Sequence, residues 1–548
     1  MTTMQKVLLI IATIGNGLAV FWLWLSPNTI AMVLLSITIL YSLIGLHDVL
    51  ISKHTLNRLY PVAAYMRYLL ESFRAEVQQY FIASNTEELP FNHEQRSLVY
   101  QRAKNERDTI AFGTQRNLLE QDYLSLWPSL QVKKVLEETK RVTFGSKDCT
   151  QPYQAALLNI SAMSFGALSP NAIEALNLGA KKGNFFHNTG EGGVSPYHLK
   201  HGGDLVWQIG SGLFGCRTED GEFDAEKFKQ TASLSNIKMI EIKLSQGAKP
   251  GHGGVLPKSK ISDEIATIRG VNKHQDCISP SNHPKASSPK ALLAFIQELR
   301  TLSDGKPIGF KLCLGNPAEF LSICKAMLET NILPDFITID GAEGGTGAAP
   351  VEFSNRLGMT CLEATYIVNN ALIGCGIRDQ IKLISAGKTA SSFDLLSKLA
   401  MGADTVNAAR TMMMALGCIQ SRSCNTNHCP TGIATQDPAR GHALNIQDKS
   451  QRVANFQRNT LYSFFELVGS MGLDNPNLLT PNMLKRRTSS ELSVSMGSLV
   501  PQLNPNALVH SQSIDGPWKE WWDGACSEAY HADDIHVLGV PSLIAQSV

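Results

Sequence analysis

The sequence predicts an α/β fold, a (β/α)8 TIM barrel preceded by an N-terminal transmembrane helical hairpin and a helical linker. Two observations carry the barrel: eight short apolar runs that end in Gly, Ser, Asn or Lys, and helical patterns between most of them. The runs are Leu157–Ser161, Phe185–Asn188, Leu205–Gln208, Met239–Lys243, Ile308–Leu312, Phe336–Asp340, Ile381–Ser385 and Thr405–Ala408. A doubly wound open sheet alternates in the same way, but eight units over about 250 residues favour the barrel.

The hairpin is predicted from an uncharged stretch near the N-terminus. Residues 7–46 contain no Asp, Glu, Lys or Arg, and the polar turn Ser26-Pro27-Asn28 divides them into two halves of bilayer length. A signal peptide would have a shorter apolar stretch followed by a cleavage site, and a buried helical hairpin is the other alternative. Basic residues such as Lys6 and Lys53 flank both outer ends, so we expect both ends to be cytoplasmic.

These patterns divide the chain into four predicted parts. They are a two-helix anchor over 1–50, a helical linker and lead-in over 51–150, the barrel over 151–480 and a C-terminal extension over 481–548. The extension contains Trp518-Lys-Glu-Trp521-Trp522, which we expect to pack on the barrel, with a role at the membrane surface as the alternative. The predicted protein is therefore multi-pass, with two spans and a cytoplasmic catalytic domain.

Composition excludes several classes of protein. Of the 548 residues, 43% are hydrophobic and 18% charged, which is typical of a globular chain and not of a disordered one. The 49 Lys and Arg balance 48 Asp and Glu, so no basic surface for nucleic acid is expected. Eleven cysteines are too few for a disulfide scaffold, and the odd number excludes complete pairing.

The loops after the predicted strands are rich in Gly and small polar residues, and in a barrel these loops form the active face. The exits of strands seven and eight each carry a cation, in Gly387-Lys388 and Ala409-Arg410, where barrels commonly bind phosphate. The sequence contains neither a P-loop motif nor a Gly-x-Gly-x-x-Gly at a strand-to-helix turn. A phosphorylated cofactor inside the barrel is therefore favoured over a nucleoside triphosphate or a dinucleotide.

Three cysteines follow the eighth strand within twelve residues, spaced Cys418-x5-Cys424-x4-Cys429 and followed by Pro430. Zinc prefers four ligands and Cys-x2–4-Cys pairs, and His428 is poorly placed as a fourth ligand because it adjoins Cys429. Three thiolates suit an iron–sulfur cluster that lacks one corner. Buried structural cysteines are the remaining alternative.

At this point the chain resembles a known family, the FMN-binding synthase domain of glutamate synthases. It is most similar to the membrane-anchored, single-domain branch of that family, and the resemblance covers roughly residues 90–480. The motifs that carry it are Ser161-Ala-Met-Ser-Phe-Gly-Ala-Leu-Ser169, Asn188-Thr-Gly-Glu-Gly-Gly193, Ile242-Lys-Leu-Ser-Gln-Gly-Ala-Lys-Pro-Gly251, Gly344-Gly-Thr-Gly-Ala-Ala349 and Cys418 through Gln436.

The resemblance implies FMN at the carboxyl ends of the strands and a [3Fe-4S] cluster on Cys418, Cys424 and Cys429. It implies reductive amination of 2-oxoglutarate with ammonia to L-glutamate, with Lys243 and Lys249 contacting flavin and substrate and Glu191 beside the reacting carbon. The cofactor-binding residues that it implies are Ser161, Met163, Ser164, Gln208, Lys243, Asp340, Gly344, Gly345, Thr346, Gly387, Lys388, Ala409 and Arg410.

The sequence departs from the family in three places. The amidotransferase domain and the C-terminal β-helix are missing, so we expect free ammonia or a separate glutaminase to supply nitrogen. Because no NAD(P) fingerprint is found, the expected electron donor is external, a ferredoxin or a separate flavoprotein subunit. His252 and Val255 stand where the family commonly has Glu and Gln, which points to a related keto acid as an alternative substrate.

Two other functions stay open at this stage. The same flavin and iron–sulfur machinery would serve a different keto or imino acid. A membrane redox relay without amino-acid turnover would show cofactor reduction but no product. A purely structural membrane protein is the least favoured, since it would bind no coloured cofactor.

Overall fold

The computed structural model describes residues 3–136, 140–499, 502–510, 514 and 516–530. The chain divides into two compact units, Met1–Asn92 and His93–Val548. In the second unit eight parallel strands close into a barrel, which confirms the predicted fold class. The barrel strands are β4 (Leu158–Ile160), β5 (His187–Asn188), β6 (Leu205–Ile209), β7 (Ile237–Lys243), β10 (Ile308–Leu312), β11 (Phe336–Asp340), β12 (Lys382–Ala386) and β13 (Thr405–Ala408).

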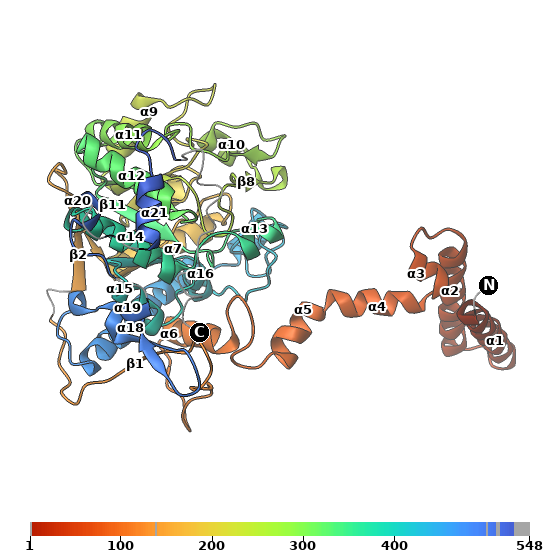
Figure 1. Cartoon of the computed structure of the whole chain (residues 1–548). Helices are drawn as coiled ribbons and strands as arrows, with labels where there is room; N and C mark the ends of the chain where they lie inside the picture. Colours follow the sequence, from red (N-terminus) through yellow and green to blue (C-terminus); the bar gives the residue numbers. More distant parts are fainter. Residues whose placement is uncertain (1–2, 137–139, 500–501, 511–513, 515, 531–548) are drawn as a thin grey trace. The chain divides into compact units, whose positions relative to one another are not determined.

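The strands follow one another around the barrel in chain order, and β13 pairs with β4 to close it, with Val406 opposite Leu158. Each of the eight predicted apolar runs overlaps one of these strands, with ends that differ by at most two residues. The strand residues are almost all buried, because one face points into the barrel and the other meets the surrounding helices. Figure 1 shows these helices around the strands.

The helices around the barrel begin at recognisable sequence signals. Ser169, Ser288 and Asn316 each cap a helix whose first residue is proline, so the capping oxygen accepts an early N–H and the proline needs none. The larger helices of this unit are α6 (His93–Lys104), α7 (Pro170–Gly183), α9 (Ala225–Ala232), α11 (Pro289–Leu302), α12 (Pro317–Thr330), α14 (Cys361–Gly374), α15 (Ser392–Ala400) and α18 (Ile446–Ser470).

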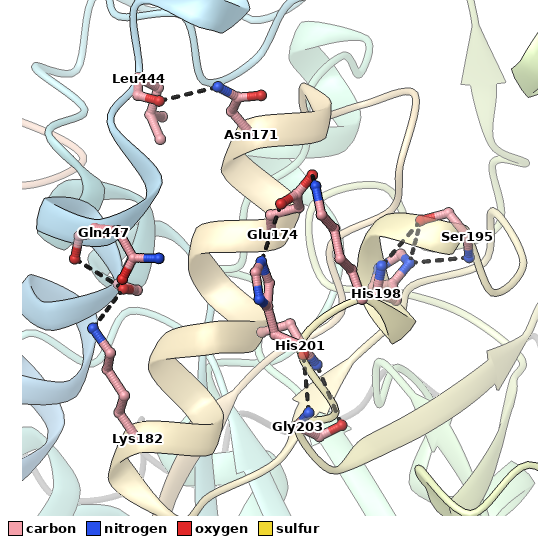
Figure 2. A network of polar contacts seen from close by, with 12 residues as sticks. Asn171, Glu174, Lys182, Ser195, His198, His201, Gly203, Leu444 and Gln447 are labelled. Atoms are coloured by element: carbon pink, nitrogen blue, oxygen red, sulfur yellow. Dashed lines mark hydrogen bonds and ion pairs between the residues drawn. The ribbon is translucent and has the colours of Figure 1, made fainter.

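Polar contacts fix α7, the helix after the first barrel strand, against its neighbours (Figure 2). Lys182 Nζ donates to Ser450 Oγ on α18 at 3.0 Å. On the other side, the buried Glu174 carboxylate accepts Lys200 Nζ at 3.0 Å and lies 3.0 Å from His201 Nε2. These contacts fix α7, and they also restrain the loop after β4, because that loop leads directly into α7.

An excursion leaves the barrel between β7 and β10. It contains β8 (Val255–Leu256), a 3-10 turn η3 (Lys258–Lys260), α10 (Asp263–Arg269) and β9 (Cys277–Ile278). β8 and β9 pair as an antiparallel ribbon, with Val255 opposite Ile278. The excursion therefore belongs to the carboxyl-end face of the barrel, where the strand exits gather.

The N-terminal unit contains α1 (Thr3–Leu25) and α2 (Thr29–Leu50), which pack side by side as a hairpin (Figure 1). Asn28 caps α2 by accepting Ala31 N–H, and Asn16 Nδ2 donates to Ser42 Oγ at 2.7 Å between the helices. Both helices are long and apolar enough to cross a membrane, and only 6% of each apolar window is buried. They are therefore not a buried core hairpin of the described chain.

Four further helical segments follow, α3 (Thr55–Leu59), α4 (Ala63–Ser72), α5 (Arg74–Val77) and the π-helical turn η1 (Gln78–Ile82). Asp48 near the end of α2 accepts Val62 N–H and Tyr65 O–H, both at 2.9 Å, and so fixes the start of α4. The expected helical linker stops earlier than predicted. Beyond Lys104 the described residues up to 136 contain no helix, because Asn105 adopts a positive φ and Gly and Pro residues interrupt the pattern that follows.

The segment after α6 instead contributes β1 (Leu124–Leu126), which pairs with β14 (Leu484–Arg487), and β14 pairs with β15 (Ser493–Ser495). The C-terminal extension also contains α21 (Pro517–Gly524), which lies against α12 (Figure 1). Trp518 and Trp521 are buried in the hydrophobic core of the barrel helices. This confirms the prediction that the tryptophan segment packs on the barrel, while residues 531–548 lie outside the described part.

Candidate active site and cysteine loop

A charged pair lies at the exits of two barrel strands, β5 and β7, which are separated by β6. Lys243 Nζ, at the end of β7, lies 2.9 Å from Glu191 Oε1 in the loop after β5, and the side chains are 10% and 19% exposed. Both line a small cavity together with Ser211, His252 and Pro280. The cavity therefore opens among the loops that were expected to form the active face.

Around this ion pair, positively charged side chains outnumber negatively charged ones. Burial alone would raise the pKa of Glu191, but Lys243 and, more weakly, Arg269 and Lys249 hold it below its ordinary value. Burial lowers the pKa of Lys249, Lys243 lowers it further, and Glu191 opposes both. Glu191 is thus an ionised carboxylate among three cations, and the site has positive charge to offer an anionic ligand.

Beneath the pair, the barrel interior holds a second carboxylate, Glu241, which is 1% exposed. Gln208 Nε2 and Asn188 Nδ2 donate to its Oε1 at 2.6 and 2.9 Å, and Thr338 Oγ1 donates to its Oε2 at 2.5 Å. Gln208, which the resemblance assigns to the cofactor, therefore uses one of its amide protons for a hydrogen bond to this buried carboxylate. Three donors from three strands satisfy Glu241 without a direct cation.

Asp340 lies at the end of β11 and also has its partners inside the chain. Lys311 Nζ lies 3.1 Å from Asp340 Oδ2, and Gly247 N–H donates to the same oxygen at 3.0 Å. Burial alone would lower the pKa of Lys311, but Asp340 and Glu241 raise it above its ordinary value. A Cβ at Gly247 would lie 1.7 Å from Gly341 O, so only glycine lets the loops after β7 and β11 meet.

Glycines and two cations form a cradle at the exits of β11, β12 and β13. A Cβ at Gly345 would lie 2.6 Å from Arg410 Cδ, and Gly387 has a φ of +143° that disfavours any side chain. Burial lowers the pKa of Lys388; Asp394 opposes this shift and the charge of Arg410 adds to it. Two half-buried cations that repel each other beside side-chain-free backbone fit the phosphate and ring of FMN.

The remaining residues assigned to the cofactor lie in the same set of loops, and all but one of them are buried or half-buried. Ser161 N–H donates to Ala408 O at 2.9 Å, and Met163 N–H donates to Asn188 O at 3.3 Å. The loop after β5 passes Ser164 closely, since a Cβ at Gly190 would lie 2.8 Å from its backbone nitrogen. Ala409 precedes α16 (Arg410–Leu416), and Gly344 lies over Gly341, whose carbonyl would be 2.9 Å from an added Cβ.

Thr346 is the exception, because it is exposed and its side chain makes no hydrogen bond within the described part of the chain. The neighbouring Glu343 contributes more to the local structure. Its carboxylate accepts Cys361 N–H at 2.9 Å, and its backbone carbonyl accepts a hydrogen bond from Arg410. Glu343 therefore holds two strand-exit loops at the cradle together.

Cys418, Cys424 and Cys429 lie in one loop, and their charges act on one another. Burial raises the pKa of Cys418 to about 11, and burial and the charge of Cys429 raise that of Cys424. Burial alone would also raise the pKa of Cys429, but the Thr431 hydroxyl and the backbone amides of residues 431, 433 and 434 lower it below its ordinary value. Cys429 is thus the one cysteine of the three whose surroundings favour the thiolate over the thiol.

The thiols do not form a site for a single ion: among the described residues no three His, Cys, Asp or Glu side chains converge on one point. A cluster makes a different demand, because each cysteine sulfur binds a separate iron. The surroundings fit such a group, since Lys260 from η3 is 3% exposed and donates to Cys424 O at 2.9 Å and Ala434 O at 3.1 Å. Burial lowers the pKa of Lys260, whereas the charges of Cys424 and Cys429 raise it. Sulfur donors, amide N–H groups and a buried cation together fit an anionic iron–sulfur cluster.

Several residues of these sites are missed by motif reading. Glu241 and Lys311 have a readable signal, because a charged residue at an alternating position of an otherwise apolar strand points into the barrel. Lys260 and Arg269 have none, since their spacing in the excursion is unremarkable. Of the two departures from the family pattern, His252 lines the cavity, whereas Val255 pairs with Ile278 in the β8–β9 ribbon and is not among the lining residues.

Comparison with known proteins now places the chain. A family model described as a conserved region in glutamate synthase matches residues 79–474. The chain belongs to the glutamate synthase family. It is 33% identical over 504 residues to the glutamate synthase large subunit-like protein YerD of Bacillus subtilis, covering 85% of this chain and 96% of that protein. Family membership supports an oxidoreductase and a flavin.

This member of the glutamate synthase family is also 33% identical over 324 residues to the archaeal glutamate synthase (NADPH) of Methanocaldococcus jannaschii, covering 59% of this chain and 60% of that protein. The matched region thus spans less than two thirds of the archaeal protein. Among solved structures, the flavin-binding domain of baker's yeast flavocytochrome b2 aligns with a TM-score of 0.40 at 10% identity, covering 82% of this chain and 92% of that one.

Proposed function

We propose that this member of the glutamate synthase family is a membrane-anchored oxidoreductase that converts 2-oxoglutarate and ammonia to L-glutamate. The observation that carries the proposal is the Glu191–Lys243 ion pair at 2.9 Å, which lines a cavity at the strand exits, with the charge of Lys249 close enough to lower the pKa of Glu191. A carboxylate and two lysines provide both charges that the reaction needs, a cationic clamp for the oxo acid and an anion for the nitrogen.

The cofactors of the proposal are FMN and a [3Fe-4S] cluster. Gly344, Gly345 and Gly387 would hold the ring, Lys388 and Arg410 the phosphate, and the cysteine loop the cluster. When bound, the cluster supplies electrons one at a time and the flavin delivers them as hydride. The glycine cradle and the lowered pKa of Cys429 support this assignment.

The chain's own residues orient the substrate and manage its charge. Lys249 and Lys243 would bind the carboxylates of 2-oxoglutarate, and Glu191 would stabilise the cationic imine that it forms with ammonia. Condensation of the oxo acid with ammonia releases one water and gives the imine. Two electrons and two protons then reduce its C=N bond to the amine. Because Glu191 is ionised in its surroundings, its role is electrostatic stabilisation of the cation.

The proposal extends to the partners and the location. Electrons would come from an external donor, a ferredoxin or a separate flavoprotein subunit, and ammonia from solution or a separate glutaminase. The two apolar helices would anchor the chain with two spans and keep the catalytic unit at the cytoplasmic surface.

A different keto or imino acid is the second candidate, and His252 favours it. Its ring lines the cavity and meets Phe353 edge-on, with 5.4 Å between ring centroids. A histidine at this wall presents a different shape and hydrogen-bonding group to the substrate than the glutamate common in the family. A site that hydrogen-bonds its substrate discriminates strongly between acids, so this change is sufficient to alter preference.

Reoxidation of the reduced flavin tests the proposal. The protein is purified in detergent, reduced anaerobically and mixed with 2-oxoglutarate, ammonium or both, while flavin absorbance and glutamate are measured. We expect reoxidation and glutamate only when both are present. If flavin stays reduced with 2-oxoglutarate but is reoxidised by another oxo acid with ammonium, the second candidate holds. If no acid and amine pair gives product while both cofactors are reducible, the chain is a redox relay.

A further inference from the structure

Lys260 is a buried cation whose compensation within the chain is incomplete. It is 3% exposed, and its ammonium donates three hydrogen bonds, to Cys424 O at 2.9 Å, Ala434 O at 3.1 Å and Ala167 O at 3.3 Å. Carbonyl oxygens carry only partial charge. Within the described residues no carboxylate forms an ion pair with Lys260, in contrast to Lys243 and Lys311.

A buried full charge without a counter-charge is unfavourable, so such a residue indicates that an anion occupies the neighbourhood. Lys260 Nζ donates to the backbone carbonyl of Cys424, one of the three cysteines of the loop, at 2.9 Å. The ammonium therefore lies beside the cysteine loop, where it can compensate the negative charge of a cluster bound there. Its hydrogen bonds fix that position, because all three of its protons are used.

The same three bonds join separate parts of the chain. Cys424 and Ala434 belong to the cysteine loop, Ala167 belongs to the loop after β4, and Lys260 itself comes from the excursion after β7. The loop after β4 carries Ser161 and Met163, on the flavin side of the site. Lys260 therefore fixes the cysteine loop to the loop that borders the proposed flavin.

We propose that Lys260 is the positioning residue of the cluster, a fixed positive charge that raises its reduction potential and ties the cysteine loop to the flavin side of the barrel. This inference rests on the proposed [3Fe-4S] cluster and names the residue that tunes it. A cation close to a redox centre favours the reduced form, because reduction adds negative charge. Removal of the charge must then lower the potential.

The test is a redox titration of the full-length holoprotein in detergent, followed through the EPR signal of the oxidised cluster. Lys260→Met removes charge and hydrogen bonds, and Lys260→Gln removes the charge but retains amide donors. Lys260→Arg retains the charge. Lys258→Met is the matched control, because Lys258 is an exposed lysine two positions away in the same turn.

We expect Lys260→Gln and Lys260→Met to shift the reduction equilibrium at least tenfold towards the oxidised cluster, about 59 mV for one electron. Lys260→Arg and Lys258→Met should shift it less than threefold. If a charge-removing variant binds flavin but no iron, while Lys260→Arg binds both, the charge is needed to hold the cluster and the inference stands.

If the cluster has the same reduction potential in Lys260→Gln and Lys260→Met as in the wild type, the inference is overturned and the proposed function is unaffected. If Lys260→Arg loses iron as completely as Lys260→Gln and Lys260→Met, the site requires the shape of the lysine side chain and not its charge. The inference then also fails. Wild-type protein that contains flavin but neither iron nor acid-labile sulfide contradicts the proposed cluster itself. Iron and sulfide analysis of the wild type therefore separates the two failures.

Discussion

The barrel interior and the cysteine loop are both buried and polar, yet they satisfy their charges differently. In the interior, Glu241 accepts hydrogen bonds from three strands and Asp340 is paired with Lys311. In the cysteine loop, Lys260 faces only carbonyl oxygens and thiols. Among the described residues the charges of the interior are satisfied by hydrogen bonds and ion pairs, whereas Lys260 at the cysteine loop has no carboxylate partner.

This difference separates two kinds of buried polar residue. A carboxylate with several donors contributes to the specificity and stability of the fold, and its loss acts on folding. A buried cation that has hydrogen bonds but no counter-charge points to a bound anion, and its loss should act on binding. Substitutions in the two regions should therefore affect different measurements.

The largest effect should follow replacement of a cysteine in the loop. In Cys429→Ser the hydroxyl cannot replace the thiolate that backbone amides stabilise, so we expect iron to be lost and glutamate formation to fall at least a hundredfold. Flavin content should be retained. Cys526→Ser outside the loop is the control, and full iron content in Cys429→Ser would contradict the assignment of the cluster ligands.

Lys243→Met should have the next largest effect, a loss of about a hundredfold in kcat/KM for reductive amination, because a charged group at the reacting atoms typically contributes that much. Lys238→Met lies in the same strand, with Lys238 Nζ 3.8 Å from Asp204 Oδ1, and it should change the rate less than twofold. Steady-state assays with a chemical electron donor measure both. Equal rates in the two variants would remove Lys243 from the catalytic site.

Glu241→Leu tests the barrel interior, where the charges have partners within the described chain. It leaves the amides of Gln208 and Asn188 and the Thr338 hydroxyl without their shared acceptor, so we expect a loss of about 3 kcal/mol in the free energy of unfolding. Glu298→Leu on the exposed face of α11 should remain within about 0.5 kcal/mol of the wild type. Thermal unfolding in detergent distinguishes them. A stable Glu241→Leu protein that had lost flavin would instead make Glu241 a cofactor residue.

Gly345→Ala should have a smaller, local effect. The added methyl must displace the Arg410 side chain, whose Cδ would lie 2.6 Å away, so we expect the Kd for FMN to rise about tenfold. Gly347→Ala is the control, because no atom lies within 4 Å of its added Cβ. Fluorescence titration of the flavin-free protein measures both, and equal affinities would show that the cradle does not bind the cofactor.

The smallest effect concerns pH. In the wild type the pKa of Glu191 lies below its ordinary value, so ionised Glu191 adds stability above about pH 4.3, which is lost as the pH falls through its folded pKa. In Lys243→Met burial dominates and should raise that pKa, so this contribution then favours low pH. The stability difference between wild type and variant should therefore shrink as the pH falls from 7. A constant difference, measured by thermal unfolding at several pH values, would show that Lys243 does not hold the charge of Glu191.

The barrel architecture could be predicted from the sequence because each barrel strand is a local run of apolar residues. All eight strands and the cysteine loop follow from runs of neighbouring residues, and Lys243 and Glu191 follow from motifs at strand exits. The contact of Lys260 with Cys424 could not be predicted in this way, because the two residues are 164 positions apart and belong to irregular segments. The end of the linker helices at Lys104 was also missed, since β1 is stabilised by β14 and not by its own neighbours.

The pairing of β1 with β14 sets the order in which this chain can complete its fold. The salt bridge beside that pairing joins Asp122 to Arg486, 364 residues later. At about 5–20 residues per second, translation takes on the order of tens of seconds to supply the missing strand. During that interval β1 has no partner edge, while Trp127 and Leu130 next to it are exposed even in the finished protein. A nascent chain of this protein therefore presents an unpaired strand beside exposed apolar side chains early, and β1 gains its partner only after the whole barrel has been synthesised.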